Sequence, residues 1–209
     1  MIAPTARDQG PRVGSRRRDP RIAWGVIGLL AQVSFMAGWV ISETWQAPGY
    51  SAFANTISDM QALNAPHVWF PIVCFAVGGV GSFCFLIFGL RPTLAPAGAV
   101  AAYAPWLLAC ATLAVGNSFP LAPCQLGPSC TAQQQLLSAG GLTDLVLSVG
   151  SFLAIVFSPQ YLWRRLRLLP SWQPFRPVAT VAEKACPALF LLLCAASIGG
   201  VGLIGKVSE

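Results

Sequence analysis

Long apolar stretches without a charged residue are the dominant pattern of this 209-residue chain. A helix needs about 20 apolar residues to cross the hydrocarbon core of a membrane. Five intervals without any Asp, Glu, Lys or Arg come close to or exceed that length: Arg21 to Glu43, Asp59 to Arg91, Arg91 to Asp144, Asp144 to Arg164 and Lys184 to Lys206. Segments rich in Pro and Gly shorten them. The pattern therefore predicts five membrane-spanning helices, at residues 22–42, 69–90, 98–117, 136–159 and 185–205.

The basic residues between these segments predict the orientation of the chain, because Lys and Arg of short loops are retained in the cytoplasm. Three groups of basic residues fall on one side of a five-helix topology, and only Lys206 falls on the other. The groups are Arg7, Arg12, Arg16, Arg17, Arg18 and Arg21; Arg91; and Arg164, Arg165, Arg167, Arg176 and Lys184. We therefore expect an all-α, polytopic membrane helical bundle with its N-terminus inside.

Composition agrees with this class. Charged residues make up 10% of the chain and hydrophobic residues 55%, with a mean hydropathy of +0.63, which is far from the surface of a soluble protein. We expect a disordered basic cytoplasmic head at 1–21, a transmembrane helical domain at 22–205 and an outer tail at 206–209. The first apolar stretch is too long for a signal-peptide core and is interpreted as a retained helix. The expected location is a bacterial plasma membrane.

Aromatic residues give a second view of the interfaces, because Trp and Tyr collect at the level of the lipid headgroups. Trp24, Tyr161 and Trp163 fit the inner interface, and Trp39, Trp45 and Trp69 fit the outer one. Trp106 does not fit either interface, because it falls well inside the third predicted helix. The arginine-rich head favours membrane lipids as partners over nucleic acid, since no interleaved aromatic residues or folded module accompany it.

Cysteine and histidine usage limits the possible cofactors. Cys124 and Cys130 are six positions apart in a loop on the predicted outer side, which favours a disulfide bond; free thiols or a metal pair are the alternatives. No nearby His or acid supports a metal. The chain contains one histidine, His67, so it can build neither a bis-histidine haem site nor a three-histidine zinc site. We expect no metal and no cofactor.

The fourth predicted helix carries an acid at a position where a charge is costly. Asp144 shares one helical face with four small residues at spacings of three or four: Ser138, Gly141, Ser148 and Ser151. An ionisable residue inside a membrane is a functional candidate by default. Asp144 could line a cavity together with Ser58, Asp59 and His67 of the first outer loop, or it could accept hydrogen bonds from a neighbouring helix in a structural role.

Small residues at spacings of four also recur along the apolar segments. Gly78 with Ser82, Ser34 with Gly38, and Ala195 with Gly199 predict close packing of helix backbones. Pro105 predicts a kink in the third helix, and Pro187 suits the first turn of the fifth.

The first outer loop carries the motif Tyr50-Ser51, Asn55-Thr56-Ile57-Ser58-Asp59-Met60, followed by Pro66 and Phe70. It resembles the uncharacterised membrane family called domain of unknown function 998 and, more distantly, the DRAM and Frag-type membrane proteins. Gly116, Phe119-Pro120 and the stretch from Cys124 to Cys130 are similar to that family's second outer loop. The resemblance implies a membrane helical fold and a candidate site at Tyr50, Ser58 and Asp59, but no established reaction.

The chain departs from this family in two ways. Members often have a His near the start of the fourth helix, where this sequence has Gln133, Gln134 and Gln135, and many have six helices. These departures put in doubt any activity that depends on the histidine.

Three functions fit the sequence. The favoured one is a non-enzymatic membrane module that binds lipid, or another membrane protein subunit, through Tyr50, Ser58, Asp59, Asp144 and Ser148. The second is an intramembrane lipid hydrolase or transferase with Asp59, His67 and Asp144 as acid and base. The third is a small transporter or proton pathway, for which one buried acid is the main argument.

Overall fold

The computed structural model describes residues 20–46, 48, 50, 57–116, 122–125 and 130–207, and these residues form helices and connecting loops without a β-strand. The expected basic head lies almost entirely outside the described residues, as do Asn55 and Thr56. The helices in chain order are α1 (Pro20–Glu43), η1 (Ile57–Gln61), α2 (Trp69–Cys84), η2 (Phe85–Leu90), α3 (Arg91–Leu94), η3 (Ala95–Ala97), α4 (Ala99–Gly116), α5 (Ala132–Leu136), α6 (Ala139–Leu166), η4 (Pro170–Phe175) and α7 (Arg176–Val207).

Three helical segments of the described chain are long and apolar enough to cross a membrane: Pro20–Glu43, Trp69–Ala97 and Ala139–Arg164. The second of these is a continuous run from α2 through the π-helical η2 to η3. The apolar part of α4, Ala99–Val115, is shorter. The prediction of an all-helical fold with membrane-spanning segments is confirmed at this level.

The observed helix bounds differ from the predicted ones at both ends of α6, at the start of α7, and at the end of the second apolar segment, which runs to Ala97 instead of residue 90. The segment predicted at 136–159 is split, because α5 ends at Leu136 and α6 begins at Ala139 and continues to Leu166. The last helix begins at Arg176 instead of residue 185, so Pro187 lies inside α7 and its predicted place in the first turn is wrong. Pro177 occupies that first turn, where the missing N–H of proline removes no helical hydrogen bond.

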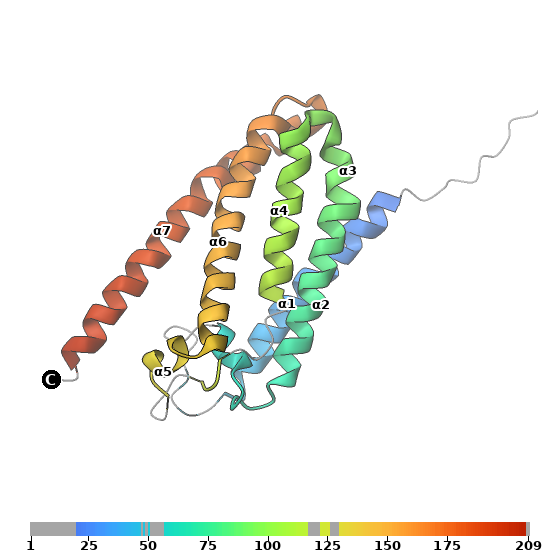
Figure 1. Cartoon of the computed structure of the whole chain (residues 1–209). Coiled ribbons are helices and arrows are strands. Elements are labelled where there is room, and N and C mark those ends of the chain that lie inside the picture. The colour runs from blue at the N-terminus through green and yellow to red at the C-terminus, as the bar shows by residue number, and fades with distance from the viewer. Residues whose placement is uncertain are drawn as a thin grey trace, which may run out of the picture.

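The long helices follow one another in space in the order in which they occur in the chain. α1 packs on α2, α2 on α4, α4 on α6 and α6 on α7. In Figure 1, α7, α6, α4 and the α2–α3 helix lie side by side, and α1 crosses α2. The expected bundle is therefore an open row, in which each long helix has its largest interfaces with the helices before and after it.

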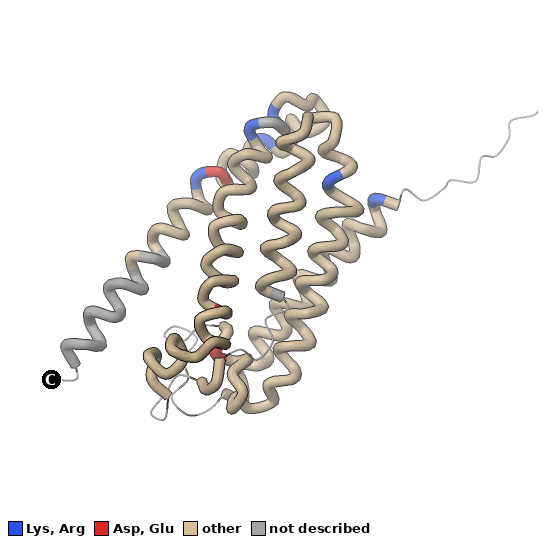
Figure 2. Tube along the Cα trace, in the orientation of Figure 1, with Lys and Arg blue, Asp and Glu red and all other residues tan. Residues whose placement is uncertain are grey.

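The two ends of this row differ in charge. Arg21, Arg91, Arg164, Arg167, Arg176 and Lys184 lie at the end formed by the start of α1, the α3–α4 turn and the α6–α7 connection, which we call the basic end (Figure 2). Asp59 and Asp144 lie at the opposite end, which we call the loop end (Figure 2). The basic end has its own apolar core, formed by Leu94, Ala101, Trp163 and Leu166. Trp163, which the sequence predicts at the inner interface, lies at the basic end and is buried in that core.

Small residues allow α1 and α2 to pack closely, as the spacing of Gly and Ser predicts. Gly38 of α1 is buried, and a Cβ atom at this position would lie 2.5 Å from Cys74 Cβ. Gly78 of α2 is also buried, and a Cβ atom there would lie 3.0 Å from Phe35 Cβ. Two hydrogen bonds connect the helices: Gln32 Nε2 donates to Ser82 Oγ at 2.9 Å, and Ser34 Oγ donates to the Cys74 carbonyl at 3.0 Å. Polar contacts of this kind hold helices together where hydrophobicity cannot.

Replacing Gly38 with Leu should destabilise the protein, because the side chain would collide with the Cys74 and Phe75 side chains. Overpacking of this kind costs about 1–3 kcal/mol. Gly25→Leu on the same helix is the matched control, since a Cβ atom at Gly25 has nothing within 4 Å. Thermal unfolding of the purified variants in detergent checks the prediction: Gly38→Leu should melt below the parent protein and Gly25→Leu should not. Equal melting temperatures for the two variants would contradict close packing at Gly38.

Candidate functional site

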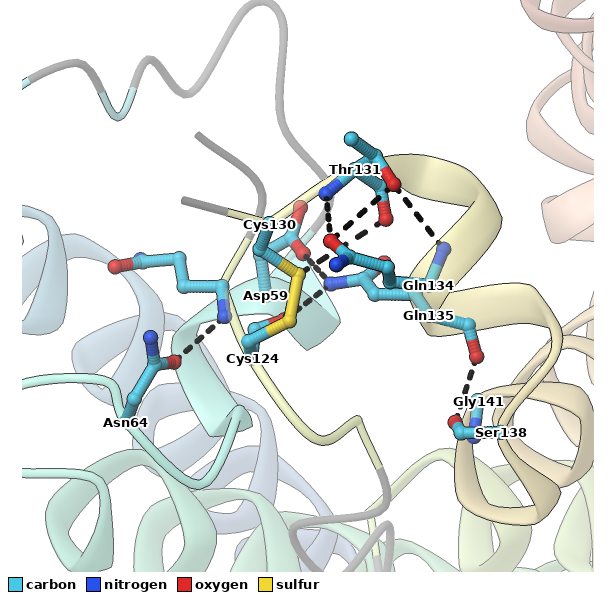
Figure 3. The surroundings of a disulfide bond; sticks show 10 residues. Asp59, Asn64, Cys124, Cys130, Thr131, Gln134, Gln135, Ser138 and Gly141 are labelled. Atoms are coloured by element: carbon cyan, nitrogen blue, oxygen red, sulfur yellow. Dashed lines mark hydrogen bonds between the residues drawn. A yellow bond between two sulfur atoms is a disulfide. The ribbon is translucent and has the colours of Figure 1, made fainter. Parts of the chain in front are cut away.

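Asp59 is the most deeply buried acid among the described residues. It lies in the short helix η1 at the loop end, and its side chain is 2% exposed. Gln135 Nε2 of α5 donates a hydrogen bond to Asp59 Oδ1 at 2.9 Å and is also 2.5 Å from the Cys124 carbonyl oxygen (Figure 3). A buried carboxylate is tolerated only where donors replace its hydration, and the Gln135 amide is one such donor.

Asp144 lies in the second turn of α6 and is half-buried. The Ser58 hydroxyl donates a hydrogen bond to the Asp144 carboxylate, and the charges of Asp144 and Asp59 are close enough to interact. The structure therefore brings Ser58, Asp59 and Asp144 together from two elements that are far apart in the sequence. We refer to Asp59 and Asp144 as the carboxylate pair.

Tyr50 adds a phenol to the same surroundings. Burial, together with the negative charges of Asp59 and Glu43, raises the pKa of Tyr50 to about 12. The neutral phenol is therefore the form that is present at physiological pH. Tyr50 is partly buried in the loop between α1 and η1, outside the helices that are candidates for spanning the membrane.

A disulfide bond organises the loop that covers Asp59. Cys124 and Cys130 are bonded, which confirms the predicted pairing, and Cys130 is 2% exposed (Figure 3). Thr131 directly follows this loop and caps α5: its side chain accepts from the Gln134 backbone N–H, and the Gln134 side chain accepts from the Thr131 backbone. This capping box fixes the start of α5 and thereby positions Gln135, the residue that follows Gln134.

Three further hydrogen bonds attach the disulfide loop to the rest of the loop end. The backbone N–H of Gln125 donates to Asn64 Oδ1, and its Nε2 donates to Gln46 Oε1, both at 2.6 Å. The Leu63 N–H donates to the Ala122 carbonyl at 3.1 Å. The loop is thus connected to the end of α1 and to the segment after η1, so the surroundings of Asp59 are fixed by contacts from several segments.

Two other predicted site residues lie apart from the carboxylate pair. His67 is exposed, has a positive φ of 50°, and places its ring edge-on to Trp45 with centroids 5.5 Å apart. Within the described chain it makes no hydrogen bond to either acid. Ser148 is half-buried one helical turn beyond Asp144 on α6, and Ser151 of the same face is buried at 3% exposure. This face of α6 is the less exposed one, as its spacing of small residues predicts.

The charge of the site determines what it can bind. Apart from Lys206 near the end of α7, the Lys and Arg residues of the described helices lie at the basic end, whereas the carboxylate pair lies at the loop end (Figure 2). Two neighbouring carboxylates attract a positively charged group, and partial burial strengthens that attraction. Within the described residues no three His, Cys, Asp or Glu side chains form a group that could hold a metal ion.

Sequence reasoning missed the amide side chains that hold the site together. In the sequence, Gln135 is only one of three consecutive glutamines, and no pattern marks Gln125 or Asn64 as site residues. The spacing of Thr131 and Gln134 is a capping-box pattern, and it was the one feature that could have located a helix start directly before Gln135.

No protein-family model, curated protein or solved structure matches the chain. The resemblance to the domain of unknown function 998 therefore stays a prediction.

Replacing Gln135 with Leu should lower stability, because Asp59 Oδ1 and the Cys124 carbonyl lose a shared donor at a buried position. The expected cost is about 1–3 kcal/mol. Gln133→Leu on the same short helix is the control, since Gln133 is exposed. Thermal unfolding in detergent, with the disulfide intact, measures the difference. A Gln135→Leu protein that melts together with the control would show that the amide does not support Asp59.

Proposed function

We propose that this chain is a five-crossing membrane protein without enzymatic activity, which binds a cationic group at its carboxylate pair on the outer surface. The observation that carries the proposal is the convergence of Asp59, Ser58 and Asp144 at the loop end, remote from the Lys and Arg residues of the basic end. A buried acid with a second acid beside it is expensive to maintain in apolar surroundings. A ligand that supplies positive charge would offset this electrostatic cost.

Two further crossings follow from α4 and α7. The apolar run of α4 connects the basic end to the loop end between two helices that can span the membrane (Figure 1). α7 is 32 residues long and, after Lys184, has no charged residue until Lys206. Five crossings place the basic end on one side of the membrane, and the retention of Lys and Arg in the cytoplasm makes that side the inner one. We propose a bacterial plasma membrane as the location.

The proposed ligand is the amine of a phospholipid headgroup. Asp144 is five residues after the start of α6, which places it about 7.5 Å along the helix axis from the loop end. This is a depth that the polar part of a lipid reaches. Exposed Leu145 and Val146 lie beside Asp144 on α6, so lipid surrounds the same turn. A Lys or Arg side chain of another membrane protein subunit would supply the same charge and is the alternative occupant.

The lipid hydrolase or transferase receives less support from this geometry. It requires His67 to exchange protons near the acids, but His67 is exposed and packs against Trp45. Without it, the Ser58 hydroxyl has the Asp144 carboxylate beside it but no imidazole to take up and return its proton. Binding is the function that these groups can perform as they are arranged.

Accessibility labelling tests the topology. Single cysteines at Gln133, Ala95 and Ser171, all exposed, would be introduced after replacing the helix cysteines by Ala and keeping the Cys124–Cys130 disulfide. A membrane-impermeant maleimide should label the Gln133→Cys protein in intact cells. It should label Ala95→Cys and Ser171→Cys only after permeabilisation. Labelling of Ala95 and Ser171 on opposite sides would contradict the five-crossing arrangement.

Neutralising the acids tests the proposed ligand. Asp59→Asn and Asp144→Asn should each weaken the binding of phosphatidylethanolamine by about tenfold, the effect of losing one charge-assisted contact. Native mass spectrometry of the detergent-purified protein, titrated with this lipid, gives the apparent affinity. Glu183→Gln is the control, because Glu183 is an acid at the basic end (Figure 2). Unchanged binding in both Asp variants, with folding intact, would contradict an amine site at the carboxylate pair.

A further inference from the structure

A second binding surface lies at the basic end, on the side of α4. A groove of about 450 Å³ is lined by Arg91, Ala99, Ala102, Tyr103 and Trp106. Arg91 is the first residue of α3, and the other four residues lie on one face of α4 at spacings of one, three and four. The two alanines leave space between the arginine and the aromatic rings. The groove is therefore a feature of the α3–α4 hairpin alone.

Arg91 gives the groove a positive end. Its side chain is exposed, and of the described acids only Glu183 lies at the basic end, beside Lys184 (Figure 2). Arg91 lies six residues before Ala97, the last residue of its helical run, so it is about 9 Å from the α3–α4 turn and level with the second turn of α4. A guanidinium group binds phosphate oxygens in bidentate geometry, which makes a phosphate the matching anion.

The rest of the groove is apolar except for the hydroxyl of Tyr103 and the indole N–H of Trp106. Tyr103 is 61% exposed and Trp106 is 43% exposed, and the Trp106 ring contacts Phe83 of α2 at a centroid distance of 6.3 Å. Residues 99 to 106 extend about 10 Å along the helix axis, from the α3–α4 turn toward the middle of α4. Trp106 thus lies below the usual aromatic belt, with its indole N–H and the Tyr103 hydroxyl on a surface that faces lipid.

We propose that this groove binds one anionic phospholipid of the leaflet at the basic end. Arg91 takes the phosphate, Tyr103 and Trp106 donate to the ester oxygens below it, and the apolar wall of α4 receives the upper part of an acyl chain. Arg91, Tyr103 and Trp106 present a cation, a hydroxyl and an indole N–H within one groove, and these are donors to the phosphate and ester oxygens of a phospholipid. A soluble anion would use Arg91 but would have no use for the exposed aromatic rings. This site is independent of the carboxylate pair, which lies at the other end of the helix row and carries the opposite charge.

Titration of the purified full-length protein with phosphatidylglycerol, followed by native mass spectrometry, tests the proposal. Arg91→Gln removes the cation, and Ala102→Leu fills the groove without changing any charge. Each variant should weaken the binding of phosphatidylglycerol by about tenfold. Arg176→Gln and Ala23→Leu are the matched controls, since both residues are exposed at the basic end and neither lines the groove. Both control variants should keep the affinity of the parent protein.

Several outcomes would overturn the proposal. Parental affinity in Ala102→Leu would show that the groove is not occupied, and an equal loss in Arg176→Gln and Arg91→Gln would show general attraction to the basic end. Equal affinity of the parent protein for phosphatidylcholine would show that the phosphate-to-arginine contact does not select anionic lipid. Thermal unfolding of Arg91→Gln and Ala102→Leu at the parental temperature confirms that a loss of binding is not a loss of fold. Asp59→Asn should leave phosphatidylglycerol binding unchanged, which separates this test from that of the amine site.

Discussion

Backbone N–H and C=O groups in hydrocarbon find partners only within their own segment, and this constraint shapes the whole chain. It makes every apolar stretch helical and moves charged residues to the helix ends. The described part of the chain follows this rule: apart from Lys206, its Lys and Arg lie at one end of the helix row and the carboxylate pair at the other (Figure 2). Polar groups that remain between the ends are used for helix contacts, as in the hydrogen bond from Gln32 to Ser82.

The carboxylate pair depends on contacts that the same constraint does not provide. Asp59 and Ser58 lie in η1, Asp144 in α6 and Gln135 in α5, and the disulfide loop joins these elements to the end of α1. A disulfide that closes a short loop reduces the freedom of the unfolded chain, and the capping box then fixes the direction of α5. Each acid is therefore held by neighbours that are distant in sequence, and the loop end is a folded cap instead of a set of separate connections.

The sequence predicted the features that depend on local composition. Apolar intervals located both ends of α1 and α4 to within two residues, and the starts of α2 and α6 to within three, but they did not locate where the helical runs of α2 and α6 end. The spacing of small residues indicated the α1–α2 interface at Gly38 and Gly78. The pairing of Cys124 with Cys130 followed from their separation and shared loop. These patterns involve residues that are close together in the sequence, so they can be recognised without knowledge of the fold.

Features set by backbone geometry or by distant partners could not be predicted in the same way. The positive φ of His67 turns the chain after η1, and no sequence pattern predicts that its ring packs against Trp45. Gln135 looks like its neighbours Gln133 and Gln134 in the sequence, and only the capped turn of α5 selects it to face Asp59. The early start of α7 reflects Pro177, which a first helical turn accepts, whereas Pro187 is accommodated inside the helix.

An open helix row has a consequence for both proposed sites. In a closed bundle, a polar face such as that of α6 would be reached only from the loops. Here α1 exposes Leu29, Leu30 and Val33, and α6 exposes Leu142 and Val146, so hydrocarbon contacts the row along its length. Lipid in each leaflet can reach the adjoining site by lateral movement within the membrane. A module with an acidic site at one end and a basic site at the other would then sort lipids by headgroup charge with no pathway through its interior, since each leaflet meets only one of the two sites.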